Sequence, residues 1–210
     1  NDNRGYAISY ANGTLSIQKA DLTLSGTRPY DGSTVMAGTY LTAHGVNGET
    51  FTVVGAGATG NLSTRNVQTA QPLATSAGLA LGSSDNGGLS SNYNALGIAG
   101  SSVTVTPKPV TLTAPTASKV YDGTSSYVAT SDDLSALSAQ LGVVGDGVSA
   151  STLSFVNKNA GLGNKALTLS AATVNDGHSG LNYAISYAGN SNSTICLLYT
   201  SDAADDTPCV

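Results

Sequence analysis

The sequence repeats itself, and this repetition constrains the fold more than any other feature. The pentapeptide YAISY occurs at residues 6–10 and again at residues 183–187. Midway between the two copies, Asn92-Tyr93 matches Asn182-Tyr183, so the equivalent tyrosines are spaced by 87 and 90 residues. Such a period is longer than the roughly 20–50 residues of solenoid repeats, so each unit is expected to be a domain.

Other segments recur with the same period and define the unit boundaries. The triplet Tyr-Asp-Gly occurs once per unit, as Tyr30, Asp31, Gly32 and as Tyr121, Asp122, Gly123. Further along, GVNGE (45–49) faces GVVGD (142–146), and TRNV (64–67) faces NKNA (157–160). We therefore divide the chain into the closing strand of a preceding repeat (1–15), a first repeat (16–104) and a second repeat (105–195). Each repeat closes on its Asn-Tyr strand.

Within each unit, apolar residues alternate with polar ones, as in half-buried strands. The segments PVTLTA, STLSFV, KALTLS and NYAISY show this period of two, and Asp-Gly and Asn-Gly turns separate such segments. The sequence therefore predicts an all-β fold of tandem immunoglobulin-like β-sandwich repeats. The alternative is a β-grasp-like unit, in which a short helix over Ser131–Gly142 packs on a sheet. Asp132 and Asp133 mark its expected N-cap, and Gly142 its end.

Two connecting segments bear on the overall arrangement. The Gly/Ser-rich stretch Ala74–Ser91 of the first unit is expected to be a loop. Pro107 and Pro109 stiffen a short extended connection between the units. This favours a rod of successive beads over a collapsed two-domain globule.

The last fifteen residues, CLLYTSDAADDTPCV (196–210), resemble nothing upstream. They are similar, in one reading frame, to the translation of a transposon-type sequencing adapter; the alternative is a natural acidic tail. We interpret the segment as adapter-derived and disordered, and exclude it from fold reasoning. A disulfide between Cys196 and Cys209 is therefore not predicted.

Charge and hydropathy exclude two classes of function. Without the three aspartates of the last fifteen residues, the formal net charge changes from −5 to −2. The nearly neutral remainder has no cluster of Lys or Arg that could neutralise nucleic-acid phosphates. It also has no apolar run approaching the roughly 18 residues that a membrane helix needs. We expect neither nucleic-acid binding nor membrane insertion.

The segment KVYDGT (119–124) makes a family resemblance specific. The chain resembles the tandem YDG-type repeats of large bacterial exoproteins, many of them similar to filamentous haemagglutinin-like adhesins exported by two-partner secretion. Lys108-Pro109-Val110, the GDGV loop (145–148), FVNKNAG (155–161) and NYAISY belong to the same pattern. The first unit matches more loosely, with RPYDGS and TRNVQT. The resemblance covers residues 16–195 and implies a secreted or surface-exposed, repetitive β structure with no catalytic residues to carry over.

Three sequence patterns could indicate a catalytic, cofactor or metal site. The segment FTVVGAGATG (51–60) fits G-x-G-x-x-G, but no amphipathic helix follows, which favours a glycine-rich turn over a dinucleotide site. His44 and His178 occupy non-equivalent loops, and no nucleophile elbow accompanies them. The acidic turns offer oxygens for Ca²⁺ but lack a calcium-loop pattern, which favours solvated turn residues at Asp132, Asp133, Asp146 and Asp176. We predict no catalytic residue, no cofactor and no metal site.

The residues that define the repeat are interpreted as structural. Tyr30 and Tyr121 are expected to bury their rings against the core, and the Asp-Gly that follows each to form a tight turn. The second set of repeat-defining residues is the Asn-Tyr pair of each closing strand, Asn92, Tyr93, Asn182 and Tyr183.

The expected function is non-enzymatic: a stalk or spacer segment of a secreted or surface-exposed bacterial adhesin-like exoprotein. Its partners would be the neighbouring repeats of its own chain, with a host or matrix surface contacted by other parts of the parent protein. One alternative is that the repeats themselves bind carbohydrate or a host protein through end loops. Another is that they space a secreted enzyme whose catalytic domain lies outside the fragment.

Overall fold

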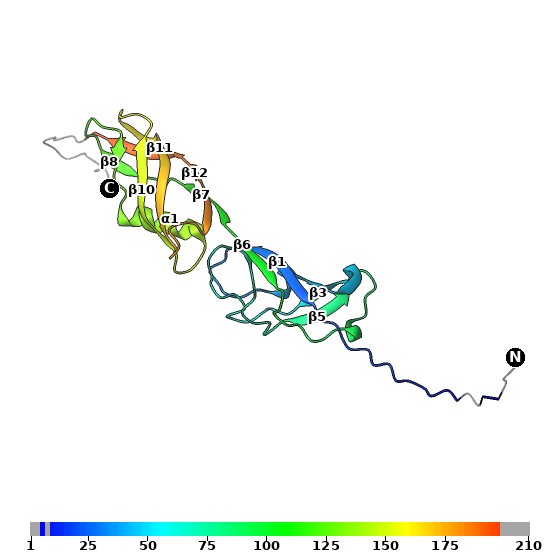
Figure 1. The fold of residues 1–210 in the computed structure, drawn as a ribbon. Coiled ribbons are helices and arrows are strands. Elements are labelled where there is room, and N and C mark those ends of the chain that lie inside the picture. Colours follow the sequence, from blue (N-terminus) through cyan, green and yellow to red (C-terminus); the bar gives the residue numbers. More distant parts are fainter. Residues whose placement is uncertain (1–4, 7–8, 198–210) are drawn as a thin grey trace.

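The computed structural model describes residues 5–6 and 9–197 of the 210-residue chain. Figure 1 shows two β-rich units that follow one another, joined where strand β6 continues into β7. Part of the first YAISY copy, and all of the segment interpreted as adapter-derived except Cys196 and Leu197, lie outside the described residues. Cys196 is the buried last residue of strand β13 (Asn190–Cys196), so the expectation of disorder is wrong there, and it is disulfide-bonded although no disulfide was predicted.

The first unit is built on a six-stranded mixed sheet. Its strand order is β4-β6-β1-β2-β3-β5, in which β1 and β6 are parallel and the other neighbours antiparallel. Three short 3-10 helices, η1 (Gly38–Tyr40), η2 (Val46–Gly48) and η3 (Ser90–Asn92), lie between the strands. The strands are β1 (Thr23–Pro29), β2 (Leu41–His44), β3 (Thr50–Val54), β4 (Gln68–Gln71), β5 (Ala80–Ser84) and β6 (Ser102–Thr106).

The second unit contains a five-stranded sheet, a two-stranded sheet and a helix. The larger sheet has the order β8-β13-β11-β10-β9, and the smaller one pairs β7 with β12 in parallel. Helix α1 (Ser131–Leu141) packs against β10 and β7. The strands are β7 (Lys108–Thr113), β8 (Ser118–Val120), β9 (Ser126–Tyr127), β10 (Gly147–Phe155), β11 (Gly161–Asn175), β12 (Tyr183–Ala188) and β13 (Asn190–Cys196).

The sequence repeat is also a structural repeat in one parallel strand pair of each unit. In the first unit β1 runs parallel to β6, with Arg28 opposite Val105. In the second unit β8 runs parallel to β13, with Lys119 opposite Ile195. The 15-residue β11 spans the positions that β4 and β5 occupy separately in the first unit, since it pairs with both β13 and β10. The units therefore share a framework and differ in how its strands are connected.

The alternating apolar residues form the core, as the period of two predicts. In the second unit Leu153 and Phe155 of β10 and Leu167 and Leu169 of β11 are buried. Leu24, Phe51, Val53, Val103 and Val105 are buried in the first unit. Leu15 and Ile17 differ: they carry the same alternation but are 88% and 87% exposed, in an extended segment that leaves the first unit (Figure 1).

The predicted helix is confirmed, but the N-cap expected at Asp132 and Asp133 is wrong, because both residues lie in the first turn. Thr130 is the N-cap and forms a capping box with Asp133, whose backbone N–H donates to Thr130 Oγ1 at 3.2 Å. Gly142 ends the helix in the left-handed conformation, with φ of 62°. Lys108 Nζ donates to the carbonyl of Leu141 at 2.7 Å, which places a cation at the negative end of the helix dipole.

Other details of the sequence interpretation need correction. The stretch Ala74–Ser91 is not entirely loop, because β5 forms within it and pairs with β3. The YAISY segment at 183–187 is the penultimate strand of its unit, since β13 follows it and pairs with β8 and β11. The mostly β character is confirmed, and α1 is the one α-helix of the part of the chain that the structure describes.

Replacing Thr130 by Ala removes the side-chain acceptor for the N–H of Asp133. We expect the free energy of unfolding to fall by about 1 kcal/mol, as for other N-cap losses. Urea denaturation followed by circular dichroism measures this change. Thr130→Ser keeps the acceptor oxygen and serves as the control; equal destabilisation by both substitutions would contradict the capping role.

Candidate functional site at the junction of the two units

Both Tyr-Asp-Gly segments form the same turn. In the first unit Asp31 Oδ1 accepts from the backbone N–H and the hydroxyl of Ser33 at 2.8 and 2.9 Å. In the second unit Asp122 Oδ1 accepts from the same two groups of Thr124, both at 2.9 Å. An aspartate that hydrogen-bonds the backbone two residues on is a recurrent turn-forming device. The motif is therefore a four-residue unit, Tyr-Asp-Gly-Ser/Thr.

A basic residue three positions before each aspartate completes the turn. Arg28 forms an ion pair with Asp31 at 2.6 Å, and Lys119 forms one with Asp122 at 2.7 Å. Hydrogen bonds from Lys119 and Thr124 lower the pKa of Asp122 to about 2. Arg28 also donates to the carbonyl of Ser33 at 2.7 Å, so it binds both ends of its turn. The role of Arg28 and Lys119 in these turns could not be read from the sequence pattern.

The tyrosine of the first turn lies between the two units. Tyr30 is 1% exposed, and its ring packs edge-on against Tyr183 of the second unit, with the ring centroids 5.5 Å apart. Its hydroxyl donates to Asp146 Oδ2 at 2.7 Å, and the hydroxyl of Tyr183 donates to the same oxygen at 2.8 Å. The carboxylate of Asp146, whose side chain is fully buried, thus receives one tyrosine from each unit.

Arg65 of the first unit neutralises this carboxylate. Its Nη2 lies 2.7 Å from Asp146 Oδ1 and also donates to the backbone carbonyl of Asp176 at 2.8 Å. The guanidinium carbon lies 5.9 Å from the centroid of the Tyr30 ring, within range of a cation–π interaction. Arg65 therefore contacts the acid, the loop that carries Asp176 and the aromatic ring at once.

The Asn-Tyr pair of the second unit provides a further link. Asn182 is fully buried; its side-chain oxygen accepts from the N–H of Val67 at 2.9 Å, and its amide donates to Asn66 Oδ1 at 3.1 Å. Asp176 positions this residue, since Asp176 Oδ2 accepts from the N–H of Asn182 at 3.1 Å. The TRNV segment of the first unit thus contacts the closing Asn-Tyr of the second.

The electrostatics at the junction follow from burial and from these bonds. Burial, then the hydrogen bond to Asp146, raise the pKa of Tyr30 well above its usual range, and the same two causes raise that of Tyr183. The hydrogen bond to Asp146 raises the pKa of Arg65. Burial alone would raise the pKa of Asp176, but the backbone N–H groups of Gly180, His178 and Asn182 outweigh it and lower that pKa. The side chains of Tyr30 and Tyr183 therefore stay protonated and donate hydrogen bonds to Asp146.

The structure brings together three of the ten repeat-defining residues. Tyr30, Asn182 and Tyr183 meet at the junction. Asn92 is exposed and lies in the first unit, where Tyr93 donates to Glu49 at 2.7 Å. Tyr121 is 41% exposed, so the expectation that its ring is buried in the core is wrong. The remaining four, Asp31, Gly32, Asp122 and Gly123, form the two turns.

Sequence reasoning missed Arg65 as a junction residue. It was wrong to interpret Asp133, Asp146 and Asp176 as solvated turn residues, because the structure buries Asp133, Asp176 and the side chain of Asp146. The signal was present, because TRNV aligns with NKNA and GVNGE with GVVGD, which keeps a basic residue and an acid in equivalent positions of each unit. What the alignment does not contain is that the basic residue of one unit meets the acid of the next. That pairing depends on how the units are placed along the chain.

The other candidate sites are the glycine motif at 51–60, His44 and the possible metal ligands. The 51–60 glycine motif follows β3 as a turn in which Gly55, Gly57 and Gly60 have positive φ. Ser25 Oγ lies 2.7 Å from His44 Nε2 on the exposed face of β1 and β2, and among the described residues no hydrogen bond reaches His44 Nδ1. Within the described ranges, no group of three His, Cys, Asp or Glu side chains could hold a metal ion.

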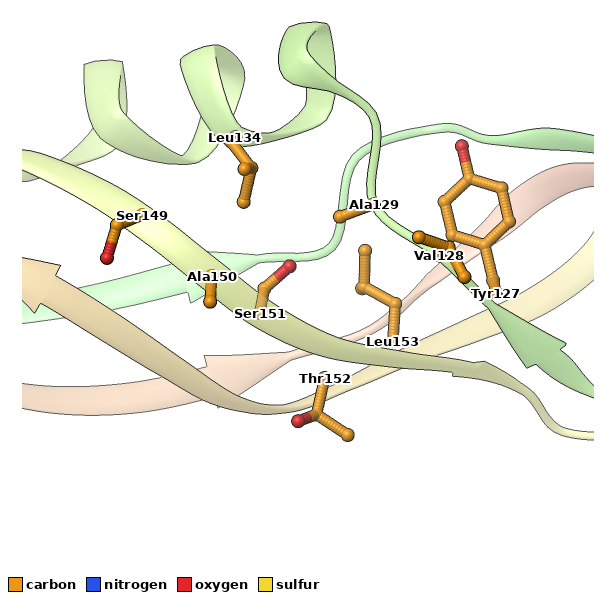
Figure 2. A pocket seen from close by; sticks show the side chains of 9 residues that line it. All are labelled: Tyr127, Val128, Ala129, Leu134, Ser149, Ala150, Ser151, Thr152 and Leu153. Carbon is orange, nitrogen blue, oxygen red and sulfur yellow. The ribbon is translucent and has the colours of Figure 1, made fainter.

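A shallow groove lies between α1 and β10 (Figure 2). It has a volume of about 370 Å³, and small aliphatic and hydroxyl side chains line it. Leu134 points down from the helix toward β10, while Thr152 points to the opposite side of the strand. The hydroxyl of Ser151 is buried with no hydrogen-bond partner among the described residues. No charged residue lines the groove.

Among the described residues, no helix is long and apolar enough to cross a bilayer.

Replacing Asp146 by Ala leaves two buried phenols without an acceptor and Arg65 without its ion-pair partner. We expect a loss of about 2–4 kcal/mol in the free energy of unfolding, since each unsatisfied buried group costs about 1–3 kcal/mol. Urea denaturation followed by tyrosine fluorescence measures it. Glu49→Ala is the matched control, because Glu49 accepts from one tyrosine within its own unit. If Asp146→Ala were as stable as Glu49→Ala or more stable, the proposed role of Asp146 at the junction would be contradicted.

The junction should also weaken in alkali. The pKa values of Tyr30 and Tyr183 are raised above the ordinary value of 10 in the folded protein, so both states are protonated below pH 10 and the contribution is fully present there. Above pH 10 the unfolded chain loses these protons first, so stability falls as pH rises. Urea denaturation between about pH 8 and about pH 11 measures this fall, which the variant Tyr30→Phe/Tyr183→Phe should reduce. An unchanged slope in that variant would contradict the assignment.

Comparison with known proteins supports the family resemblance over the second unit. No curated protein and no solved structure was found to match the chain. Residues 106–192 match the YDG domain family. This range begins at the last residue of β6 and ends within β13, so it coincides with the second structural unit. The second unit of the chain is therefore a YDG domain.

Proposed function

We propose that this chain is a non-enzymatic spacer segment of a secreted or surface-exposed bacterial exoprotein, with adhesion as the purpose of the whole protein. The observation that carries the proposal is the junction at Asp146. A spacer must transmit direction from one unit to the next, and a connection of the length of Thr106–Lys108 cannot do so alone. The ion pair of Arg65 with the buried Asp146 carboxylate and the two phenols provide that rigidity.

The arrangement of the two units agrees with this function. The units follow one another with the β6–β7 connection between them, which gives the described part an elongated shape (Figure 1). We retain the immunoglobulin-like sandwich as the proposed class of the second unit, since that unit separates a five-stranded from a two-stranded sheet, whereas the strands of the first unit form one six-stranded sheet. Helix α1 packed on β10 is the feature that the β-grasp alternative would use.

The groove between α1 and β10 favours a second candidate function, in which the repeats themselves bind carbohydrate. The buried hydroxyl of Ser151 has no protein partner among the described residues, and Tyr127 provides a ring among the residues that line the groove. A glycan array probed with the whole chain tests this alternative. Binding that is lost in Ser151→Ala and Leu134→Arg variants would favour it over the spacer.

The spacer proposal predicts a stiff two-lobed particle. Small-angle X-ray scattering of the chain should give a pair-distance distribution with two resolved maxima, because the units are held apart and in line. The variant Tyr30→Phe/Arg65→Ala removes the junction contacts and should broaden the second maximum. A broad distribution in the unmodified chain would contradict a rigid spacer.

The proposed location has its own test. Antibodies raised against the chain should label intact, unpermeabilised cells of the source bacterium, or detect the parent protein in the culture medium. Labelling only after the cells are opened would contradict a secreted or surface-exposed protein.

A further inference from the structure

The YDG turn of the second unit carries the same groups as the turn at the junction, but it is uncovered. Tyr30 is 1% exposed, whereas Tyr121 is 41% exposed. A Cβ atom on Gly32 would lie 2.4 Å from Val143 Cγ1 of the second unit, whereas one on Gly123 would meet nothing within 4 Å. Among the described residues the hydroxyl of Tyr121 has no hydrogen-bond partner.

The strand framework presents the two tyrosines in the same way. The N–H of Tyr30 donates to the carbonyl of Thr106, the last residue of β6, at 2.8 Å. The N–H of Tyr121 donates to the carbonyl of Cys196, the last residue of β13, at 2.7 Å. Residue 196 thus occupies the place of residue 106, immediately before the connection to the next unit. A chain continuing from β13 would leave beside Tyr121 as β6 leaves beside Tyr30.

The groups that surround Tyr30 also have counterparts around Tyr121. Lys158 and Asn159 align with Arg65 and Asn66, which bind the carboxylate of Asp146 and the amide of Asn182 at the junction. Both Lys158 and Asn159 are exposed. The second unit therefore exposes a phenol, a cation and an amide where the first unit has them engaged.

The complementary surface exists on the first unit. Glu49 aligns with Asp146, and its Oε2 accepts from Tyr93 as Asp146 accepts from Tyr183. No hydrogen bond within the described part of the chain reaches Glu49 Oε1, and Val46, which aligns with Val143, is 52% exposed. One end of each unit therefore carries hydrogen-bond donors. The opposite end carries a carboxylate that already accepts a hydrogen bond from a tyrosine of its own unit.

We propose that Tyr121, Lys158 and Asn159 form a docking surface for a further YDG-type unit of the same chain. That unit would contribute the acid and the Asn-Tyr pair that correspond to Asp146, Asn182 and Tyr183. The inference rests on the proposed spacer function and adds its mechanism. Donor and acceptor surfaces lie on opposite ends of each unit, so the contact is head-to-tail and does not close. Successive repeats then share one fixed geometry.

Chemical nitration of tyrosine tests this surface. Residues 196–210 are replaced by a copy of residues 106–195, and the copy carries Tyr121→Phe, so that a single Tyr121 remains. In the present chain tetranitromethane should nitrate Tyr121, whereas Tyr30 is protected. In the extended chain we expect Tyr121 to lose its reactivity and to match Tyr30 in the same molecule, as measured by peptide mass spectrometry.

Two variants distinguish docking from nonspecific shielding. Asp146→Ala in the added copy removes the acceptor and should restore nitration of Tyr121 in the extended chain. Lys158→Glu, at an exposed position that leaves the added copy unaltered, should do the same. Equal nitration of Tyr121 in the present and extended chains would overturn the inference. Tyr30 would remain protected in that case, and the spacer proposal, which rests on the existing junction, would stand.

Discussion

The arrangement of the two units depends on one buried carboxylate. The side chain of Asp146 is fully buried, and a buried carboxylate is costly without compensating donors. Its own unit supplies Tyr183, and the neighbouring unit supplies Tyr30 and Arg65. Because neither unit satisfies the acid alone, the two are coupled by the requirement to solvate it. A polar junction of this kind fixes direction as well as distance, since charge-assisted hydrogen bonds have strict geometry.

The junction explains the role of the turn that occurs once in each unit. Asp31 and Asp122 form the turns, and the glycines that follow adopt φ of 80° and 77°, a conformation that disfavours other residues. Arg28 and Lys119 fix each turn to the strand that precedes it. These three positions place the tyrosine beyond the end of its own sheet. The tyrosine side chain therefore projects beyond its own unit. Tyr30 is buried because the second unit covers it, and Tyr121 is exposed because no described residue covers it in the same way.

Much of this fold could be predicted from the sequence. The period near 90 residues, the alternating strands and the helix at Ser131–Gly142 all follow from local patterns, and all three are present. The strand pairing could not be predicted, since parallel pairs such as β1–β6 join segments far apart in the chain. For the same reason β5 was missed: its residues, ALGSS, lack a strong alternation, and pairing with β3 makes them a strand. Arg65 and Asp146 were visible only as aligned positions, because an alignment of repeats does not show which end of one unit meets the next.

The central claim is that the carboxylate of Asp146 makes the two units tumble as one body. Backbone ¹⁵N relaxation of the chain measures this directly, residue by residue. The account predicts a single axially elongated diffusion tensor that fits the amides of residues 23–106 and of residues 108–196 together. Two separate tensors, each with the shorter correlation time of an isolated unit, would contradict it.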